Sequence, residues 1–221
     1  MSDKKRKNKY IKTKEKNYKK IVIVMILVLI IVGITFFIKN FNNTSKNSKI
    51  GNNSTSQEIV DYILNVSSYD TEIEVEVKSN KNSNKYKIRQ KYINKENNEQ
   101  EILEPSNIQG IKIIKENSNL RIENSRLSLT KIIENYQDIT QNNLDLSSFI
   151  ENYKNNTNSK YKEENNQIIM ETTAMYTENN YQKYETLYIA KDTGKPIKME
   201  IKDTNQNIII YIIYNEIEIY T

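Results

Sequence analysis

One long apolar run and many short alternating patterns divide the chain. Residues 21–38 read IVIVMILVLIIVGITFFI and contain no charged side chain. As a helix, this run measures roughly 27 Å, close to the ~30 Å hydrocarbon core of a bilayer. It is longer than the ~7 to 15 apolar residues of a signal peptide and no A-x-A site follows it, which indicates an uncleaved transmembrane anchor. The anchor residues are Ile21, Val22, Ile23, Leu27, Leu29, Phe36, Phe37 and Ile38.

Two helices are predicted in the rest of the chain, each from an apolar stripe at helical spacing. The first begins near residue 56, where Thr55 and Glu58 have capping-box spacing, and ends by about residue 68. Ser148 and Glu151 have the same spacing in the second. A weaker helical pattern covers residues 131–136. The stripes consist of Ile59, Tyr62, Ile63 and Val66 in the first helix and Leu146, Phe149, Ile150 and Tyr153 in the second.

Strand patterns fill most of the remaining sequence. Apolar and charged residues alternate along residues 72–78, which is typical of a half-buried strand, and KDTGKP at residues 191–196 predicts a tight hairpin. About eight to ten strands emerge, and a curved antiparallel sheet wrapped around the helices buries both stripes most simply. The predicted fold class is mainly β (α+β). The other candidate strands cover residues 86–92, 101–104, 111–114, 120–122, 168–173, 184–190, 197–202 and 208–219.

The last of these strands is apolar on both faces. Strict alternation puts Ile209, Tyr211, Ile213, Ile217 and Ile219 on one face and Ile208, Ile210, Ile212 and Tyr214 on the other. A strand in a one-sided sheet is normally polar on its outer face, so something must cover the second apolar face or it is an exposed patch. Three explanations remain open: burial by a loop or helix of the same domain, a protein interface (homodimer or heteromer), and a cavity for acyl chains.

Tyrosines also gather just before the predicted hairpin of residues 191–196, at Tyr176, Tyr181, Tyr184 and Tyr188. Tyr is favoured at binding surfaces because it adds a large area with a polar tip. The candidate partner or ligand surface therefore consists of Ile208, Ile210, Ile212, Tyr214, Tyr184 and Tyr188.

The absence of Cys, His and Trp restricts the chemistry. Ser-His-Asp and Cys-His catalysis and disulfides are excluded, and a zinc or copper site is not expected. The sequence has neither a Gly-rich phosphate loop nor an Asp-x-Asp calcium loop. The alternating Glu residues of 72–78 and the pair Glu163–Glu164 fit a solvated strand face better than a general acid and base. We expect no enzymatic activity, no catalytic, cofactor-binding or metal-binding residues, and no cofactor.

Basic charge is concentrated before the apolar run. Of 33 basic and 28 acidic residues, residues 1–20 hold ten and two, which leaves 23 and 26 for the rest. The domain therefore gives no charge-based reason to expect nucleic acid. By the positive-inside rule the tail is cytoplasmic, which makes the protein a single-pass protein of the cell membrane with its C-terminal domain outside. The predicted organisation is a basic cytoplasmic tail (1–20), a transmembrane helix (21–38), a flexible linker (39–56) and an extracytoplasmic β domain (57–221).

Four stretches, taken in order, resemble one family: EILEPSNIQGI, NLDLSSFIENY, LYIAKDTGKPIKMEI and IYIIYNEIEI, which begin at residues 101, 143, 187 and 210. They resemble the germination lipoprotein GerS and its relatives in spore-forming bacteria, which are similar to the larger LolA/LolB-like group of lipoprotein carriers. The resemblance covers roughly residues 57–221 and implies a half-barrel of antiparallel strands closed by helices. One feature departs from the family: GerS-type lipoproteins attach through a lipidated Cys, which this chain lacks.

The resemblance also implies two functions. GerS-type proteins are non-enzymatic partners of a cortex-modifying N-acetylmuramoyl-L-alanine amidase, and LolA-type proteins hold acyl chains. We therefore expect a membrane-anchored accessory protein that binds a cell-envelope partner, with a peptidoglycan (cortex) amidase of sporulation or germination as the candidate. The alternative is a carrier or sensor of lipids or lipoproteins. The first function predicts a filled interior, and the second predicts a large dry cavity.

Overall fold

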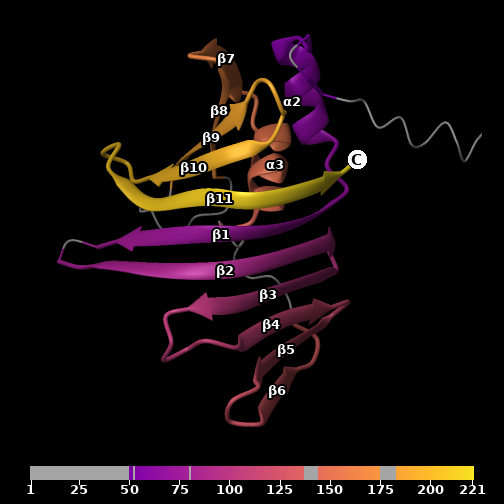
Figure 1. Ribbon diagram of the computed structural model, residues 1–221, viewed down its shortest axis with the longest axis vertical. Helices are drawn as coiled ribbons and strands as arrows, with labels where there is room; N and C mark the ends of the chain where they lie inside the picture. The colour runs from indigo at the N-terminus through magenta and orange to yellow at the C-terminus, as the bar shows by residue number, and fades with distance from the viewer. Residues whose placement is uncertain (1–49, 52, 80, 137–143, 175–182) are drawn as a thin grey trace, which may run out of the picture. The chain divides into compact units, whose positions relative to one another are not determined.

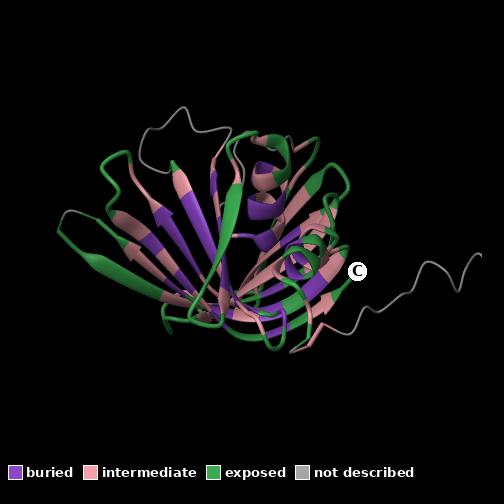
Figure 2. Ribbon diagram, turned by 90° about the horizontal axis from the view of Figure 1, so that it is seen from above, coloured by how far each residue is buried: buried purple, intermediate pink, exposed green. Residues whose placement is uncertain are grey.

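The described residues form a curved antiparallel sheet of eleven strands with two helices against its concave side (Figures 1 and 2). The computed structural model describes residues 50–51, 53–79, 81–136, 144–174 and 183–221. The predicted tail, the predicted transmembrane helix and most of the predicted linker lie outside these ranges. Within these ranges, no helix is long and apolar enough to cross a membrane. The predicted mainly β fold, with a curved sheet packed on short helices, is confirmed for the described residues.

The strand order is β6-β5-β4-β3-β2-β1-β11-β10-β9-β8-β7, so neighbouring strands are consecutive in sequence except where β1 pairs with β11. Two meanders therefore meet in the middle of the sheet, and β6 and β7 are its two edges. The strands are β1 (Ser68–Lys78), β2 (Ser83–Asn94), β3 (Asn97–Glu104), β4 (Ile111–Glu116), β5 (Asn119–Asn124), β6 (Leu129–Ile133), β7 (Lys160–Glu164), β8 (Gln167–Thr173), β9 (Tyr184–Ala190), β10 (Pro196–Lys202) and β11 (Ile208–Tyr220).

Helix α2 (Ser56–Leu64) begins as its sequence predicts. Thr55 is the N-cap, its hydroxyl accepts from the backbone N–H of Glu58, and the Glu58 carboxylate accepts from the backbone N–H of Thr55. This reciprocal pair satisfies two backbone donors that the helix itself cannot. The helix ends a few residues before the predicted limit, at Leu64, because β1 begins at Ser68. Its buried residues are Ile59, Val60 and Ile63.

Helix α3 (Leu146–Asn155) begins earlier than predicted. Its N-cap is Asp145, so the predicted capping box of Ser148 and Glu151 is wrong. The Asp145 side chain makes no capping hydrogen bond, because its Oδ1 accepts from the side-chain amides of Gln90 at 3.0 Å and Gln100 at 2.7 Å. These bonds join the start of α3 to strands β2 and β3.

Two strands differ from the sequence prediction. The weak helical pattern over residues 131–136 is wrong, because β6 occupies Leu129–Ile133 and pairs with β5. Thr130, Ile132 and Ile133 are β-branched and favour a strand. Strand β7 was not predicted, because KYKEE has no apolar alternation. The hairpin between β9 and β10 is confirmed, and its Gly194 adopts φ +66, a left-handed conformation that other residues rarely adopt.

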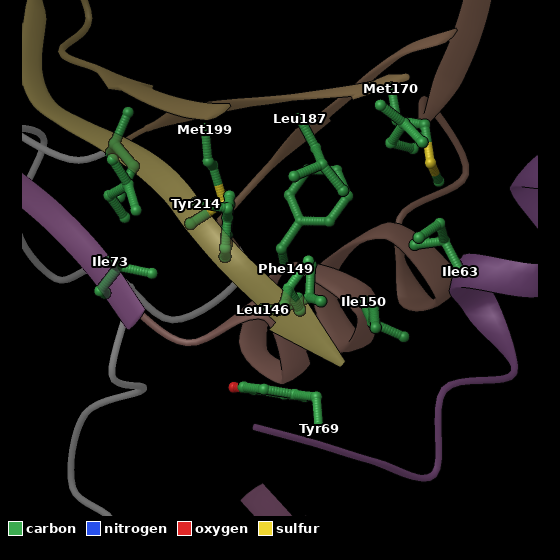
Figure 3. Packing of buried hydrophobic residues seen from close by; sticks show 14 of the residues in the cluster. Ile63, Tyr69, Ile73, Leu146, Phe149, Ile150, Met170, Leu187, Met199 and Tyr214 are labelled. Atoms are coloured by element: carbon green, nitrogen blue, oxygen red, sulfur yellow. The ribbon is translucent and has the colours of Figure 1, made fainter. Parts of the chain in front are cut away.

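The hydrophobic core fills the concave side of the sheet between its strands and the two helices. Figure 2 shows buried residues along the strands and on the helix surfaces that face them. In Figure 3, Phe149 and Leu146 of α3 lie close to Tyr214 of β11 and Leu187 of β9. Helix α2 contacts β7 and β8, and α3 contacts β8. The helices therefore lie over β7 and β8, and side chains of α3 reach Glu185 of β9 and pack in the same cluster as Tyr214 of β11.

Candidate functional site

The residues of the predicted surface lie on two different faces of the sheet. Ile210, Ile212 and Tyr214 of β11 face the core and are only 6%, 0% and 6% exposed. Figure 3 shows Tyr214 beside Met199 within this cluster. These side chains are part of the packing beneath the helices and are not accessible to a partner.

A β-bulge explains why strict alternation placed part of β11 on the wrong face. The register with β1 shifts between Tyr214 and Glu216, which lie opposite adjacent residues of β1, so Asn215 has no residue opposite it. One inserted residue reverses the faces of all residues beyond it. Ile217 is consequently buried on the same side as Tyr214, whereas the sequence pattern grouped it with Tyr211.

The other predicted residues, Tyr188, Tyr184 and Ile208, lie on the convex side. Tyr188 of β9 lies opposite Lys198 of β10. In the same sheet, Tyr184 and Ile208 both lie opposite Lys202, at the border of this region. Each of the three is partly exposed. The structure therefore separates them from the three core residues of β11.

Continuing the register across β10 and β11 extends this convex region. Lys198 lies opposite Ile213, and Glu200 lies opposite Tyr211. Positions that lie directly opposite in an antiparallel pair share a face and contact one another. The residues that we call the convex patch are Tyr184, Tyr188, Lys198, Glu200, Tyr211 and Ile213.

Charged and aromatic groups interlock at the centre of the convex patch. The Lys198 ammonium lies 4.0 Å from the ring centroid of Tyr188 and 5.4 Å from that of Tyr211. Its Nζ is 2.8 Å from Glu200 Oε1, and Lys202 Nζ is 3.4 Å from Glu200 Oε2. The Tyr188 hydroxyl donates to Glu200 Oε2 at 3.2 Å. The Lys198 ammonium group therefore interacts with a carboxylate and with two aromatic rings at the same time.

These contacts hold the patch in its charged form. Burial alone would raise the pKa of Glu200, which is 6% exposed, but the hydrogen bond from Lys198 and the charges of Lys198 and Lys202 outweigh it and lower that pKa. Burial alone would lower the pKa of Lys198, and the hydrogen bond to Glu200 and its charge raise it instead. At neutral pH the pair is therefore an ion pair whose charges are already matched.

The sequence prediction found part of this patch. Tyr184 and Tyr188 were named, and Lys198, Glu200 and Tyr211 were missed. A Lys-x-Glu pattern in β10 is ordinary for a solvated strand, and only the register with β9 and β11 puts tyrosines on both sides of it. The predicted hairpin could have supplied the first of these pairings, because it makes β9 and β10 neighbours.

The concave side contains a second group of polar residues. Glu185 of β9 is 1% exposed, and the Asn152 side-chain amide donates to its two oxygens at 3.2 and 3.0 Å. Burial raises the pKa of Glu185 to about 7, and the hydrogen bond from Asn152 opposes that rise. Among the described residues, no three Asp, Glu, His or Cys side chains gather in a way that could hold a metal ion.

Comparisons with known proteins give structural likeness only. No protein-family model and no curated protein matches the chain. An uncharacterized conserved protein from Thermus thermophilus is similar with a TM-score of 0.48 and 11% identity, over 76% of this chain and 89% of that one. A structure of the CwlD amidase from Clostridioides difficile in complex with the GerS lipoprotein is similar with a TM-score of 0.42 and 25% identity, over 76% of this chain and 94% of that one. A LolA superfamily protein from Nitrosomonas europaea is similar with a TM-score of 0.40 and 12% identity, again over 76% of this chain and 94% of that one.

Proposed function

We propose that the protein is a non-enzymatic, single-pass membrane protein whose extracytoplasmic domain binds a cell-envelope protein through the convex patch. The observation that carries the proposal is the composition of this patch: two half-exposed tyrosines and Ile213 surround an ion pair that is already formed. Tyrosine-rich surfaces with little unpaired charge are typical of the centre of a protein interface.

The neighbouring part of the convex face supports this choice by contrast. There, Glu72 of β1 pairs with Lys87 of β2 at 2.7 Å, and Glu74 and Glu76 lie opposite Lys87 and Lys85. That region has the charged outer surface expected of a one-sided antiparallel sheet. The β9–β11 region departs from this pattern, as do Ile169 of the neighbouring β8 and Ile114 of β4, which are buried on the same face. A binding partner that covers Tyr188, Tyr211 and Ile213 would account for the departure.

A peptidoglycan amidase is the candidate partner, and this assignment is supported by the sequence resemblance to GerS-type proteins. The filled core between the helices and β8–β11 agrees with an accessory protein better than with a carrier in that part of the domain. The membrane anchor and the extracytoplasmic location are supported by the apolar run and the basic tail.

The proposal is tested by affinity purification of the tagged full-length protein from its own membranes, with mass spectrometry of proteins and lipids. We expect a wall hydrolase to be enriched with the wild type and at least about tenfold less with Tyr211→Ala combined with Ile213→Lys, because central interface residues contribute ~2 kcal/mol or more. Tyr220→Ala removes an exposed tyrosine outside the patch and serves as the matched control. Equal enrichment with both variants would overturn the proposed surface.

A carrier function is the second candidate, and one observation favours it. Ile102, Ile113 and Ile122 lie on the concave side of β3–β5, are only half-buried, and are not part of the core cluster. Apolar side chains in such a position could contact an acyl chain. Co-purification of lipid or lipoprotein without a protein partner would establish the carrier function and exclude the accessory function.

A further inference from the structure

The two edge strands of the sheet differ in how far their unpaired backbone N–H and C=O groups are protected from pairing with another strand. Among the described residues, β6 and β7 each pair with one neighbour, so alternate residues on each direct an N–H and a C=O away from the sheet. Such groups are a template for another strand unless the edge is protected. The side chains along each edge therefore decide whether a further strand can bind.

The β7 edge is protected. Four of its five residues are charged, and Lys162 pairs with Glu164 at 2.8 Å. The Tyr161 hydroxyl donates to the Gln57 side chain of α2 at 2.9 Å, and Glu163 bonds to Ser56 of α2 and to Lys191. Charged edge residues and attachment to a helix are known ways of preventing strand addition.

The β6 edge has the opposite character. Leu127, Leu129 and Ile132 are 64%, 61% and 59% exposed. They make up half of the six large hydrophobic side chains that are exposed in the described part of the chain, and they lie within six residues of one another. Single exposed apolar residues are common, but three within six residues, two in an edge strand and Leu127 in the turn before it, mark an interaction site.

We propose that β6 binds an extended segment of a partner protein as a twelfth strand of the sheet. The free N–H and C=O groups specify an extended backbone, and Leu129 and Ile132, which lie on opposite faces of β6, favour apolar side chains on both faces of it. Lys131, the central residue of β6, favours an acidic residue directly opposite. This interface is separate from the convex patch and goes beyond the proposed function, so either can fail without the other.

The sequence of β6 disfavours a second copy of this chain as the occupant. The two-fold antiparallel pairing that uses the whole strand is centred on its middle residue, Lys131. It would put Lys131 directly opposite Lys131, and like charges in that position are destabilising. A different polypeptide need not place a lysine opposite Lys131 and so avoids this repulsion.

The test uses the full-length protein and two synthetic peptides of about ten residues, a length typical of a strand and its turns. One peptide has two Val residues on each side of a central Glu with Thr residues beyond them, and the other is the same peptide with every backbone nitrogen methylated. We expect the first to slow hydrogen exchange of β6 amides about tenfold or more, and the second to have no effect because it cannot donate to an edge.

Side chains are tested with Leu129→Asp combined with Ile132→Asp, which should abolish protection by the first peptide. The comparison of the two peptides on the wild type remains decisive if this variant folds poorly. The proposal is overturned by equal protection with both peptides, or by none up to about 1 mM. Protection of β6 that rises with protein concentration in the absence of peptide would overturn it in favour of self-association.

Discussion

At the scale of single residues, Glu185 should make the stability of the domain depend on pH. It faces Asn152 of α3 and lies opposite Thr172 of β8 and Ile201 of β10. Burial raises the pKa of Tyr214 of β11, and the charges of Asp145 and Glu185 add to that rise. The pKa of Glu185 itself is about 7 in the folded state, against 4.5 as the ordinary value. The folded protein therefore keeps a proton that the unfolded chain loses. The contribution of this proton to the free energy of unfolding is fully present below about pH 4.5 and is lost as the pH rises through about 7.

The free energy of unfolding should fall by about 3 kcal/mol across this range, from the size of the pKa difference. Urea unfolding at pH 5 and pH 8 measures the change. Glu185→Gln keeps the shape and the hydrogen-bonding capacity, and it should remove the fall. An unchanged pH dependence in that variant would show that another group titrates.

The hydroxyl of Tyr214 gives a second prediction at this scale. It is buried and has no hydrogen-bond partner among the described residues. An unpaired buried polar group costs ~1 to 3 kcal/mol. Tyr214→Phe should therefore raise the free energy of unfolding by about 1 kcal/mol, as measured by urea unfolding at a fixed pH. A loss of stability would instead reveal that a buried water or another molecule occupies the site.

At the scale of elements, the capping box of α2 is the clearest local determinant. Thr55→Ala removes the hydroxyl that accepts from Glu58 N–H, and it should lower the free energy of unfolding by ~1 kcal/mol. Thr55→Ser keeps the acceptor and is the control. Thermal unfolding followed by circular dichroism measures both variants. If the alanine and serine variants unfold at the same temperature, the cap contributes nothing to the stability of the domain.

Most elements could be predicted because their local pattern and their tertiary environment agree. The alternation in β1 and the helical stripe of α2 each match the face that is buried. β7 could not be predicted, because its position at an exposed edge depends on pairing with β8, and no local pattern encodes that pairing. The N-cap of α3 was missed for a related reason, since the side chain of Asp145 accepts hydrogen bonds from β2 and β3 and makes no capping bond to its own helix.

The candidate site was harder to predict than the fold. Tyr188 could be found from composition alone, whereas the role of Lys198 depends on two registers at once. The bulge at Asn215 also changed which face the residues beyond it occupy, and the register shift at Ile209 falls within a run of isoleucines, where one inserted residue leaves no trace in the sequence. Sequence periodicity therefore predicts that a strand exists more reliably than it predicts which face is accessible.

At the scale of the whole molecule, the predicted membrane topology can be tested directly because the chain has no cysteine. Ten of the 33 basic residues precede the apolar run of residues 21–38, so we expect the N-terminus to be cytoplasmic and the β domain to be outside. A single cysteine is introduced at Ser2 in one variant and at Thr221, which is exposed, in another. A membrane-impermeant maleimide applied to intact protoplasts should label only T221C.

Permeabilised protoplasts provide the control, because both variants should then be labelled equally. Labelling of S2C alone in intact protoplasts would reverse the topology and exclude an extracytoplasmic partner for the convex patch. Labelling of both variants in intact protoplasts would contradict an anchor that spans the membrane. The orientation matters for the function because a peptidoglycan amidase can meet the domain only outside the membrane, so this result decides whether the proposed partner is reachable at all.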